Sequence, residues 1–131
     1  MPEQLSNRTV EVAEIVWRII RARRARTDLF KPGLFSDPAW DMLLFLFVAG
    51  AREQIVTVTE LADSAATSIP SAVRWIDVLE REGLLQRKAE PTNMGQDIVT
   101  LGGRGMTAIC DWIENCGLAS FRTSEHSAGE A

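Results

Sequence analysis

The feature that most constrains the fold is a break between two short helical patterns at residues 67–70, Thr-Ser-Ile-Pro. The first helix is predicted from Glu60 to about Ala66. Ser68 is a predicted N-cap and Pro70 fits the first turn of a second helix, which Gly83 ends. The face of the second helix that we expect to be buried carries Ile69, Val73, Ile76 and Leu79.

The segments on either side of these two helices are strand-like. Residues 55–58 form a β-branched run, after which Thr59 is the predicted N-cap, or Thr57 if the helix begins slightly earlier. Residues 84–88 and 97–101 are also strand-like, and the residues between them include the turn formers Pro, Asn and Gly. The sequence therefore predicts a β-hairpin with a long tip after the second helix.

Two longer helices are predicted before this region. Apolar residues recur at helical spacing from Leu5 to Thr27. Asp37 is the predicted N-cap of the next helix, which has Pro38 as its first residue and runs to about Gly50. The predicted core face of that helix carries Trp40, Leu43, Leu44 and Phe47.

A last helix is predicted after the hairpin. It follows Gly102 and Gly103 and ends near Gly117. The chain past about Phe121 is polar and small, so residues 118–131 are expected to form a disordered tail. One face of the last helix carries Met106, Ile109, Cys110 and Ile113.

Size and composition exclude several classes of protein. A chain of 131 residues, 46% hydrophobic and 24% charged, is sufficient for one globular domain. No apolar run approaches the roughly 18 residues of a membrane span, and no secretory signal opens the chain, so we expect a cytoplasmic protein without membrane association. No nucleophile–base pair, Gly-rich phosphate loop or metal-spaced cluster is present. We therefore expect neither an enzyme nor a cofactor.

Charge is unevenly divided along the chain. Residues 1–35 carry seven Lys or Arg against four Asp or Glu, whereas the rest carry seven against fourteen, for a formal net charge of −4. Such a basic cluster suits phosphate binding, although solvated surface helices carry similar clusters. Most of the positive excess comes from Arg18, Arg21, Arg23, Arg24, Arg26 and Lys31.

The order of elements is helix, short strand, helix, tight turn, helix and β-hairpin. This is the order of a winged helix-turn-helix, a module that places its second helix in the DNA major groove. The predicted fold is thus mainly α with a small β-hairpin wing, an α+β winged helix-turn-helix with additional N- and C-terminal helices.

The helix-turn-helix region resembles the MarR family of bacterial winged-helix regulators, and the resemblance covers about Trp40 to Ile113. It implies a sequence-specific transcriptional regulator that binds double-stranded DNA as a homodimer. The residues that match the family pattern are Leu61-Ala62, Ser68, Arg74, Leu79-Glu80 and Gly83-Leu84.

The resemblance also implies how the chain is divided. Residues 1–35 would be an N-terminal helix and basic segment, residues 36–103 the winged domain and residues 104–117 a C-terminal helix. The helices at 5–27 and 104–117 would supply the dimer interface. A two-fold dimer presents paired recognition helices to half-sites one helical turn apart, so a palindromic operator is expected.

The sequence departs from the family pattern at the wing. The family's wing usually carries an acidic residue and one or two arginines, whereas residues 92–96 are Thr-Asn-Met-Gly-Gln. The Leu-Thr-x-x-Gly that normally follows the wing is altered to Leu-Gly-Gly-Arg-Gly at residues 101–105. These departures, with the acidic body from residue 36 onward, favour an alternative hypothesis. The chain would then be a winged-helix protein–protein interaction module that has lost its DNA-contacting wing.

The candidate DNA contacts of the second helix lie near its start. Ser68, Ser71 and Arg74 are spaced so that all three share one exposed face. Pro70 and Ser71 are short, which lets a helix N-terminus approach phosphates closely. Trp75 falls within the helical stripe and is expected in the core.

Further candidate DNA contacts lie outside that helix. Arg87 and Lys88 are adjacent on a hairpin strand, so their side chains alternate and one of them is expected to reach DNA. Arg104 is a candidate phosphate contact. The basic segment could replace contacts that the wing has lost, through Arg21, Arg23, Arg24 and Arg26.

Cys110 and Cys116 could sense oxidation, but a Cys on a helix face is more often a small buried apolar residue. His126 lies in the polar tail and is not expected to bind a metal. The resemblance leaves room for a small-molecule effector, because pockets between the flanking helices and the winged domain occur in that family.

Overall fold

The computed structural model describes residues 2–31, 33–89 and 96–118, and for residues 2–8 it describes the helix but not the side chains. The elements are five helices and a small three-stranded sheet within these residues, which confirms the predicted α+β class. In chain order they are α1 (Pro2–Leu29), α2 (Pro38–Ala51), β1 (Val56–Thr57), α3 (Val58–Ser64), α4 (Ile69–Arg81), β2 (Leu85–Lys88), β3 (Ile98–Leu101) and α5 (Gly103–Asn115).

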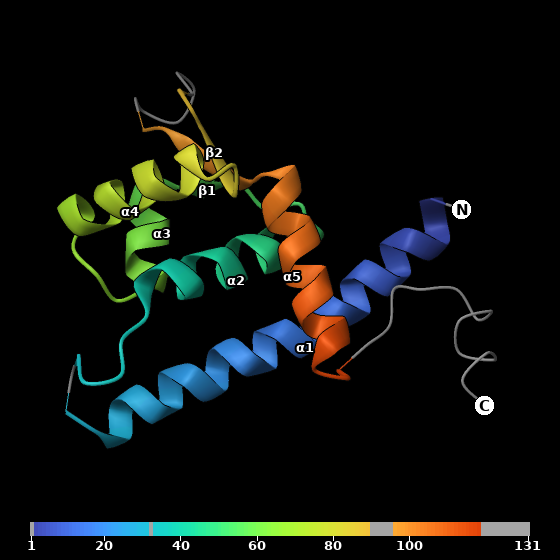
Figure 1. Ribbon diagram of the computed structural model, residues 1–131, viewed down its shortest axis with the longest axis horizontal. Helices are drawn as coiled ribbons and strands as arrows, with labels where there is room; N and C mark the ends of the chain where they lie inside the picture. Colours follow the sequence, from blue (N-terminus) through green and yellow to red (C-terminus); the bar gives the residue numbers. More distant parts are fainter. Residues whose placement is uncertain (1, 32, 90–95, 119–131) are drawn as a thin grey trace.

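Helix α2 lies at the centre of the molecule. It contacts α1 on one side and α3, α4, α5 and β3 on others, so that α1 runs along the edge opposite α4 and the hairpin (Figure 1). Because α2 is surrounded, its apolar residues form the core rather than one stripe. Trp40 of α2 also packs edge-on against Trp112 of α5, with ring centroids 4.9 Å apart. The buried side chains of α2 include Met42, Leu44, Leu46, Phe47 and Val48.

The sheet joins the hairpin to the helix-turn-helix unit. Its strand order is β1-β3-β2, with both pairs antiparallel. Ile98 of β3 stands opposite Thr57 on one side and Lys88 on the other. The strands therefore confirm the predicted hairpin, and the turn formers of its tip, residues 90–95, lie outside the described residues.

The starts of the helices follow the capping residues with one exception. Thr57 is the N-cap of α3 in a capping box with Glu60, so the earlier of the two predicted starts is right and Thr59 lies inside the helix. Ser68 caps α4, its Oγ accepting from the Ser71 amide at 3.3 Å. Asp37 occupies the N-cap position of α2 but makes no side-chain capping bond, because its ψ of 71° is far from the extended backbone that places a carboxylate over the first turn. The predicted N-cap position is therefore confirmed, although the Asp37 side chain does not cap the helix.

Four helices end in the same way, with a left-handed residue after the C-cap. After α4 and α5 this residue is Gly83 (φ 76°) and Gly117 (φ 72°), which confirms the predicted stops. After α2 and α3 it is Glu53 (φ 55°) and Ala66 (φ 52°), neither of which is a glycine. Paired backbone bonds close each end; after α3, for example, the amides of Ala66 and Thr67 donate to Asp63 and Ala62.

Ile69 and Met106 were predicted on the apolar faces of α4 and α5, and both are exposed. Ile69 is the first residue of α4 and is 48% exposed, because the buried side of the helix begins one turn later at Ala72. Met106 of α5 is also exposed, and Gly105 occupies the buried position beside it. Across the described residues, no helix has both the length and the apolarity that crossing a membrane would require.

Candidate nucleic-acid interface

The first two turns of α4 bring three predicted site residues together. Ser68 Oγ accepts from the Ser71 amide, and Arg74 Nη2 donates to Ser71 Oγ at 3.0 Å. Ser68, Pro70 and Arg74 are exposed and Ser71 is half-buried. The arrangement holds a guanidinium beside the N-terminus of a helix, where free backbone amides and the helix dipole favour an anion.

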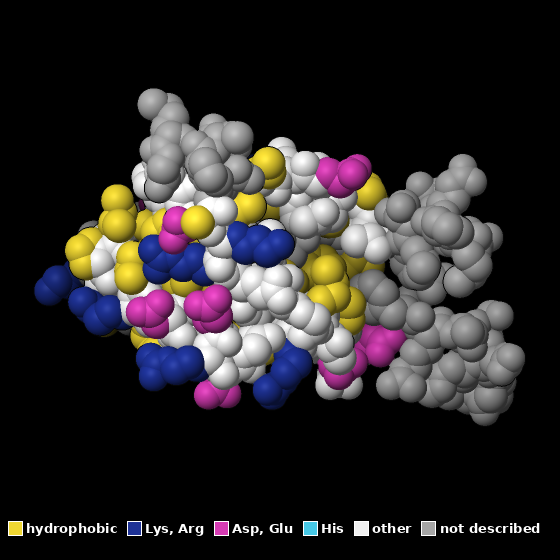
Figure 2. Space-filling view, turned by 90° about the horizontal axis from the view of Figure 1, so that it is seen from above, with side chains coloured by type: hydrophobic (Ala, Val, Ile, Leu, Met, Phe, Trp, Pro, Cys, Tyr) yellow, Lys and Arg dark blue, Asp and Glu magenta, His cyan; other side chains and the backbone are white. Residues whose placement is uncertain are grey.

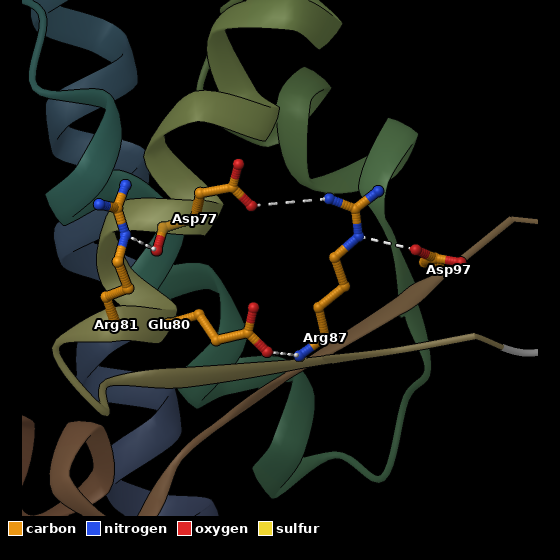
Figure 3. A network of polar contacts seen from close by, with 5 residues as sticks. All are labelled: Asp77, Glu80, Arg81, Arg87 and Asp97. Atoms are coloured by element: carbon orange, nitrogen blue, oxygen red, sulfur yellow. Dashed lines mark hydrogen bonds and ion pairs between the residues drawn. The ribbon is translucent and has the colours of Figure 1, made fainter.

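Arg87 is held at the base of the hairpin by carboxylates (Figure 3). Its Nε donates to Asp97 Oδ2 at 2.7 Å, its Nη1 lies 4.0 Å from Asp77 Oδ1, and its backbone amide donates to Glu80 Oε2. The Arg87 side chain is half-buried, and the carboxylates of Asp77 and Asp97 offset its charge. Lys88, the next residue on β2, is exposed, which agrees with the alternation expected of a strand.

The surface of α4 and the hairpin carries both signs of charge. Asp77, Glu80 and Glu82 are exposed on or just after α4. Figure 2 looks onto this side of the molecule and shows Lys and Arg side chains interspersed with acidic and apolar ones, not a continuous basic surface. Sequence-independent attraction to phosphate is therefore weaker here than on a uniformly basic face.

Arg104 lies in the first turn of α5 and is exposed. Its aliphatic stem passes over Gly83, where an added Cβ would stand 3.2 Å from Arg104 Cδ. The structure therefore places Arg104 next to the C-terminal end of α4, the opposite end from the N-cap Ser68.

The basic segment lies on the second half of α1, on the other side of α2 from the hairpin (Figure 1). Arg23 Nε is 2.5 Å from Asp41 Oδ1 in a half-buried ion pair. Arg24 covers the ring of Trp17, and Arg26 Nη2 donates to the Phe35 carbonyl at 3.2 Å. Arg21 is exposed. The four predicted arginines are thus close in sequence but differ in how free they are to bind.

A pocket of about 490 Å³ separates this basic segment from the turn between α3 and α4. Arg23, Arg24 and Arg26 line it from α1, with Phe35 and Asp41 from the start of α2 and the residues before it. Asp63, Ser64 and the two alanines that follow line the far wall. The end of α1 and the turn before α4 therefore face each other across this pocket.

No protein-family model matches the chain. Among solved structures, a protein of Archaeoglobus fulgidus aligns with a TM-score of 0.53 at 18% identity, over 70% of this chain and 91% of that one. A variant of S. aureus MepR from a multidrug-resistant clinical isolate aligns with the same TM-score at 15% identity, over 82% and 79% of the two chains. The fold is a MarR-like winged helix.

Other similarities are weaker or shorter. S. aureus MepR in complex with DNA aligns with a TM-score of 0.49 at 16% identity, over 80% of this chain and 86% of that one. A riboflavin kinase of Thermococcus kodakarensis is 38% identical over 60 residues, which are 46% of this chain and only 28% of the kinase. At these identities the likeness to solved structures concerns the fold alone.

In this fold α4 is the second helix of the helix-turn-helix unit, and the β2–β3 hairpin that follows it is the wing. Trp75 on α4 was predicted in the core, and that prediction is wrong: Trp75 is 40% exposed, as is Val78. The core face of α4 consists instead of Ala72, Ile76 and Leu79. Ala72 was the signal in the sequence, because a small residue spaced with Ile76 and Leu79 turns Trp75 away from the core.

The cysteines of the winged helix do not form a reactive pair. Both are free, with Cys110 half-buried and Cys116 exposed. Burial raises the pKa of the Cys110 thiol, and the nearby carboxylates of Asp111 and Glu114 raise it further. The thiol therefore stays protonated, which is the opposite of what a redox sensor needs. The described residues contain no cluster of His, Cys, Asp and Glu that could hold a metal ion, and His126 lies outside them.

Proposed function

We propose that this protein is a sequence-specific transcriptional regulator that binds double-stranded DNA with α4 in the major groove. The observation that carries the proposal is the exposed start of α4, where Ser68, Ser71 and Arg74 are linked by hydrogen bonds on a MarR-like winged helix. The N-terminal residues of a recognition helix are the ones that contact base edges in such folds. An Arg on that face suits guanine, whose O6 and N7 accept two hydrogen bonds from a guanidinium.

The other candidate contacts position the protein without reading sequence. Pro70 and Ser71 would let the helix start approach a phosphate, and Lys88 at the end of β2 and Arg104 in the first turn of α5 are exposed cations that could do the same. Arg87 would first have to leave its two carboxylates. From α1 the proposed phosphate contacts are Arg21, Arg24 and Arg26, while Arg23 is engaged with Asp41.

The protein would act as a homodimer through α1 and α5. Exposed apolar side chains on or next to these helices support this interface, namely Val10, Met106 and Leu118. A two-fold axis there would present two copies of α4 to half-sites one helical turn apart. A monomer at micromolar concentration in sedimentation equilibrium would contradict this part of the proposal.

A small-molecule effector fits the pocket between α1 and the α3–α4 turn. The pocket is lined by that turn, so a ligand there would contact the backbone that sets the position of α4. A bound effector would change the affinity for DNA by at most the difference between its own affinities for the two placements of α4. The setting we propose is the bacterial cytoplasm, where regulators of the MarR type act.

The test is fluorescence anisotropy with a random-sequence duplex and with the upstream region of the protein's own gene, each at two salt concentrations. We expect selective binding to the upstream region with a steep salt slope. Arg74→Ala should reduce the preference for the upstream region. The triple variant Arg21→Ala/Arg24→Ala/Arg26→Ala should instead weaken binding to both duplexes equally and lower the slope of log affinity against log salt. Arg52→Ala is the matched control, because Arg52 is an exposed arginine that covers Trp17 as Arg24 does, but it is paired with Glu14 and does not line the pocket beside α1.

A second candidate function is a protein–protein interaction module. The observation that favours it is the mixed charge of the α4 and hairpin face, where Asp77 and Asp97 offset Arg87. Absence of binding to either duplex at low salt would support this candidate and contradict the regulator.

A further inference from the structure

The outward face of α4 carries two apolar residues, Trp75 and Val78, beside the hydrogen-bonded Ser71 and Arg74. Ser71, Arg74, Trp75 and Val78 are spaced at i, i+3, i+4 and i+7, so they are neighbours on one helical face. Trp75 and Val78 are each 40% exposed, while the opposite face of the same helix is buried. The face that the proposed function turns toward DNA is therefore half apolar.

These apolar side chains are not required by the core. Ala72, Ile76 and Leu79 anchor α4 to the rest of the molecule. Trp75 and Val78 lie in water beside the hydrogen-bonded Ser71–Arg74 pair. A ligand that covered them would remove apolar surface from water, and this would make binding more favourable. The charge next to them, a guanidinium at the start of a helix, suits an anionic ligand and is continuous with the proposed DNA contacts.

The major groove offers one apolar feature, the C5-methyl group of thymine. We propose that Trp75 and Val78 are specificity-determining residues that contact thymine methyl groups, next to a base read by Arg74. One helical turn rises about 5.4 Å, which spans one to two base-pair steps, so the thymines lie within about three base pairs of that base. This inference rests on the proposed function, because it assigns sequence readout to the same helix.

The experiment begins with selection of duplexes from a random-sequence library by the wild-type protein. The same selection is made with Trp75→Ala, Val78→Ala and, as a matched control, Leu34→Ala, which removes an exposed apolar side chain from the segment between α1 and α2. Thermal unfolding of each variant establishes that it folds. We expect the wild type and the Leu34 variant to enrich one motif with fixed thymines, and the two α4 variants to lose the thymine preference.

The second step replaces each fixed thymine of the wild-type motif with deoxyuridine, which lacks only the methyl group. Wild-type affinity should fall about fourfold for each methyl contact, the value of burying one methyl-sized group. Trp75→Ala or Val78→Ala should bind the thymine and deoxyuridine duplexes equally at the position that it reads. A methyl effect that persists in both variants would overturn the inference.

The outcomes separate this inference from the proposed function. A wild-type motif that both α4 variants reproduce with unchanged thymine preference overturns the inference and leaves the regulator standing. Failure of the wild type to bind any duplex overturns both, and Trp75 and Val78 would then be a protein-docking surface. Binding without enrichment of a motif contradicts sequence readout by α4 altogether.

Discussion

Gly105 of α5 packs directly against the carbonyl group of Leu84, at the junction between α4 and β2. An added Cβ at position 105 would overlap that carbonyl oxygen and stand 2.9 Å from Leu101 Cδ1. The same oxygen also accepts a hydrogen bond from the Gly102 amide at 2.9 Å. The start of α5 is thereby fixed to the base of the wing by backbone contact, where no larger residue fits.

Gly105→Ala is expected to destabilise the fold by at least about 1–3 kcal/mol, because the methyl group would meet backbone atoms that cannot rotate away. Gly103→Ala is the matched control, since a Cβ there meets nothing within 4 Å and alanine is the better helix former. Urea unfolding of both variants measures the difference. Equal stability of the two variants would contradict the close packing of α5 on Leu84.

Ala66→Gly is expected to stabilise the fold by about 0.5–1 kcal/mol, because a left-handed backbone strains any side chain and glycine relieves that strain. Glycine also loses more entropy on folding, which reduces the gain. Ala108→Gly, at an exposed position inside α5, is the control and should lower stability by about 1 kcal/mol. The measurement is the free energy of unfolding; a loss of stability in Ala66→Gly would show that the turn before α4 is not strained.

Asp97→Asn is expected to strengthen binding to a random-sequence duplex, because it releases Arg87 from its shortest ion pair and removes a negative charge. If Arg87 then contacts a phosphate, the slope of log affinity against log salt steepens by about 0.9. Glu82→Gln removes a charge from the end of α4 without freeing an arginine of the wing, and should leave the slope unchanged. Anisotropy titrations at several salt concentrations compare the two, and identical slopes would show that Arg87 stays out of the interface.

The thiol of Cys110 is expected to react slowly with iodoacetamide at pH 7–8. Burial and the charges of Asp111 and Glu114 raise its pKa, so the thiolate fraction is small below that pKa and the rate continues to rise at higher pH. Cys116→Ser leaves Cys110 as the single thiol for this measurement. In that background Asp111→Asn should lower the pKa and speed the reaction at pH 8, whereas Asp37→Asn, on another element, should not. A pH–rate profile with an apparent pKa below that of N-acetylcysteine would contradict the expectation.

Local signals in the sequence were sufficient for the order and type of the elements. Ser68 and Pro70 start α4, Gly83 ends it, and the β-branched runs at residues 55–58 and 98–100 contain β1 and β3, because each of these preferences acts within a few residues. Helix ends without glycine could not be placed as well. The prediction ended α3 at about Ala66, whereas the helix ends at Ser64 and Ala66 is the left-handed residue after it.

Properties that depend on packing were not visible in the sequence. The phase of α4 differs from the predicted stripe because Ala72 approaches the core more closely than Ile69 or Trp75 can. The ion pair between Arg23 and Asp41 joins residues on separate helices, so nothing in their spacing predicts it. These contacts decide which of the candidate cations remain free, and for that reason the candidate site was less predictable than the fold.

Thr57 belongs to two elements at once, since it is the last residue of β1 and the N-cap of α3. No linker therefore separates the sheet from the helix-turn-helix unit, and one residue inserted between them would break either the strand register or the capping box. Breaking the pairing of Thr57 with Ile98 also releases the cap, so backbone amides of the sheet and of the start of α3 should exchange with solvent as one cooperative unit. Any displacement of the wing is then transmitted to the helix beneath α4 as a rigid movement, without a hinge.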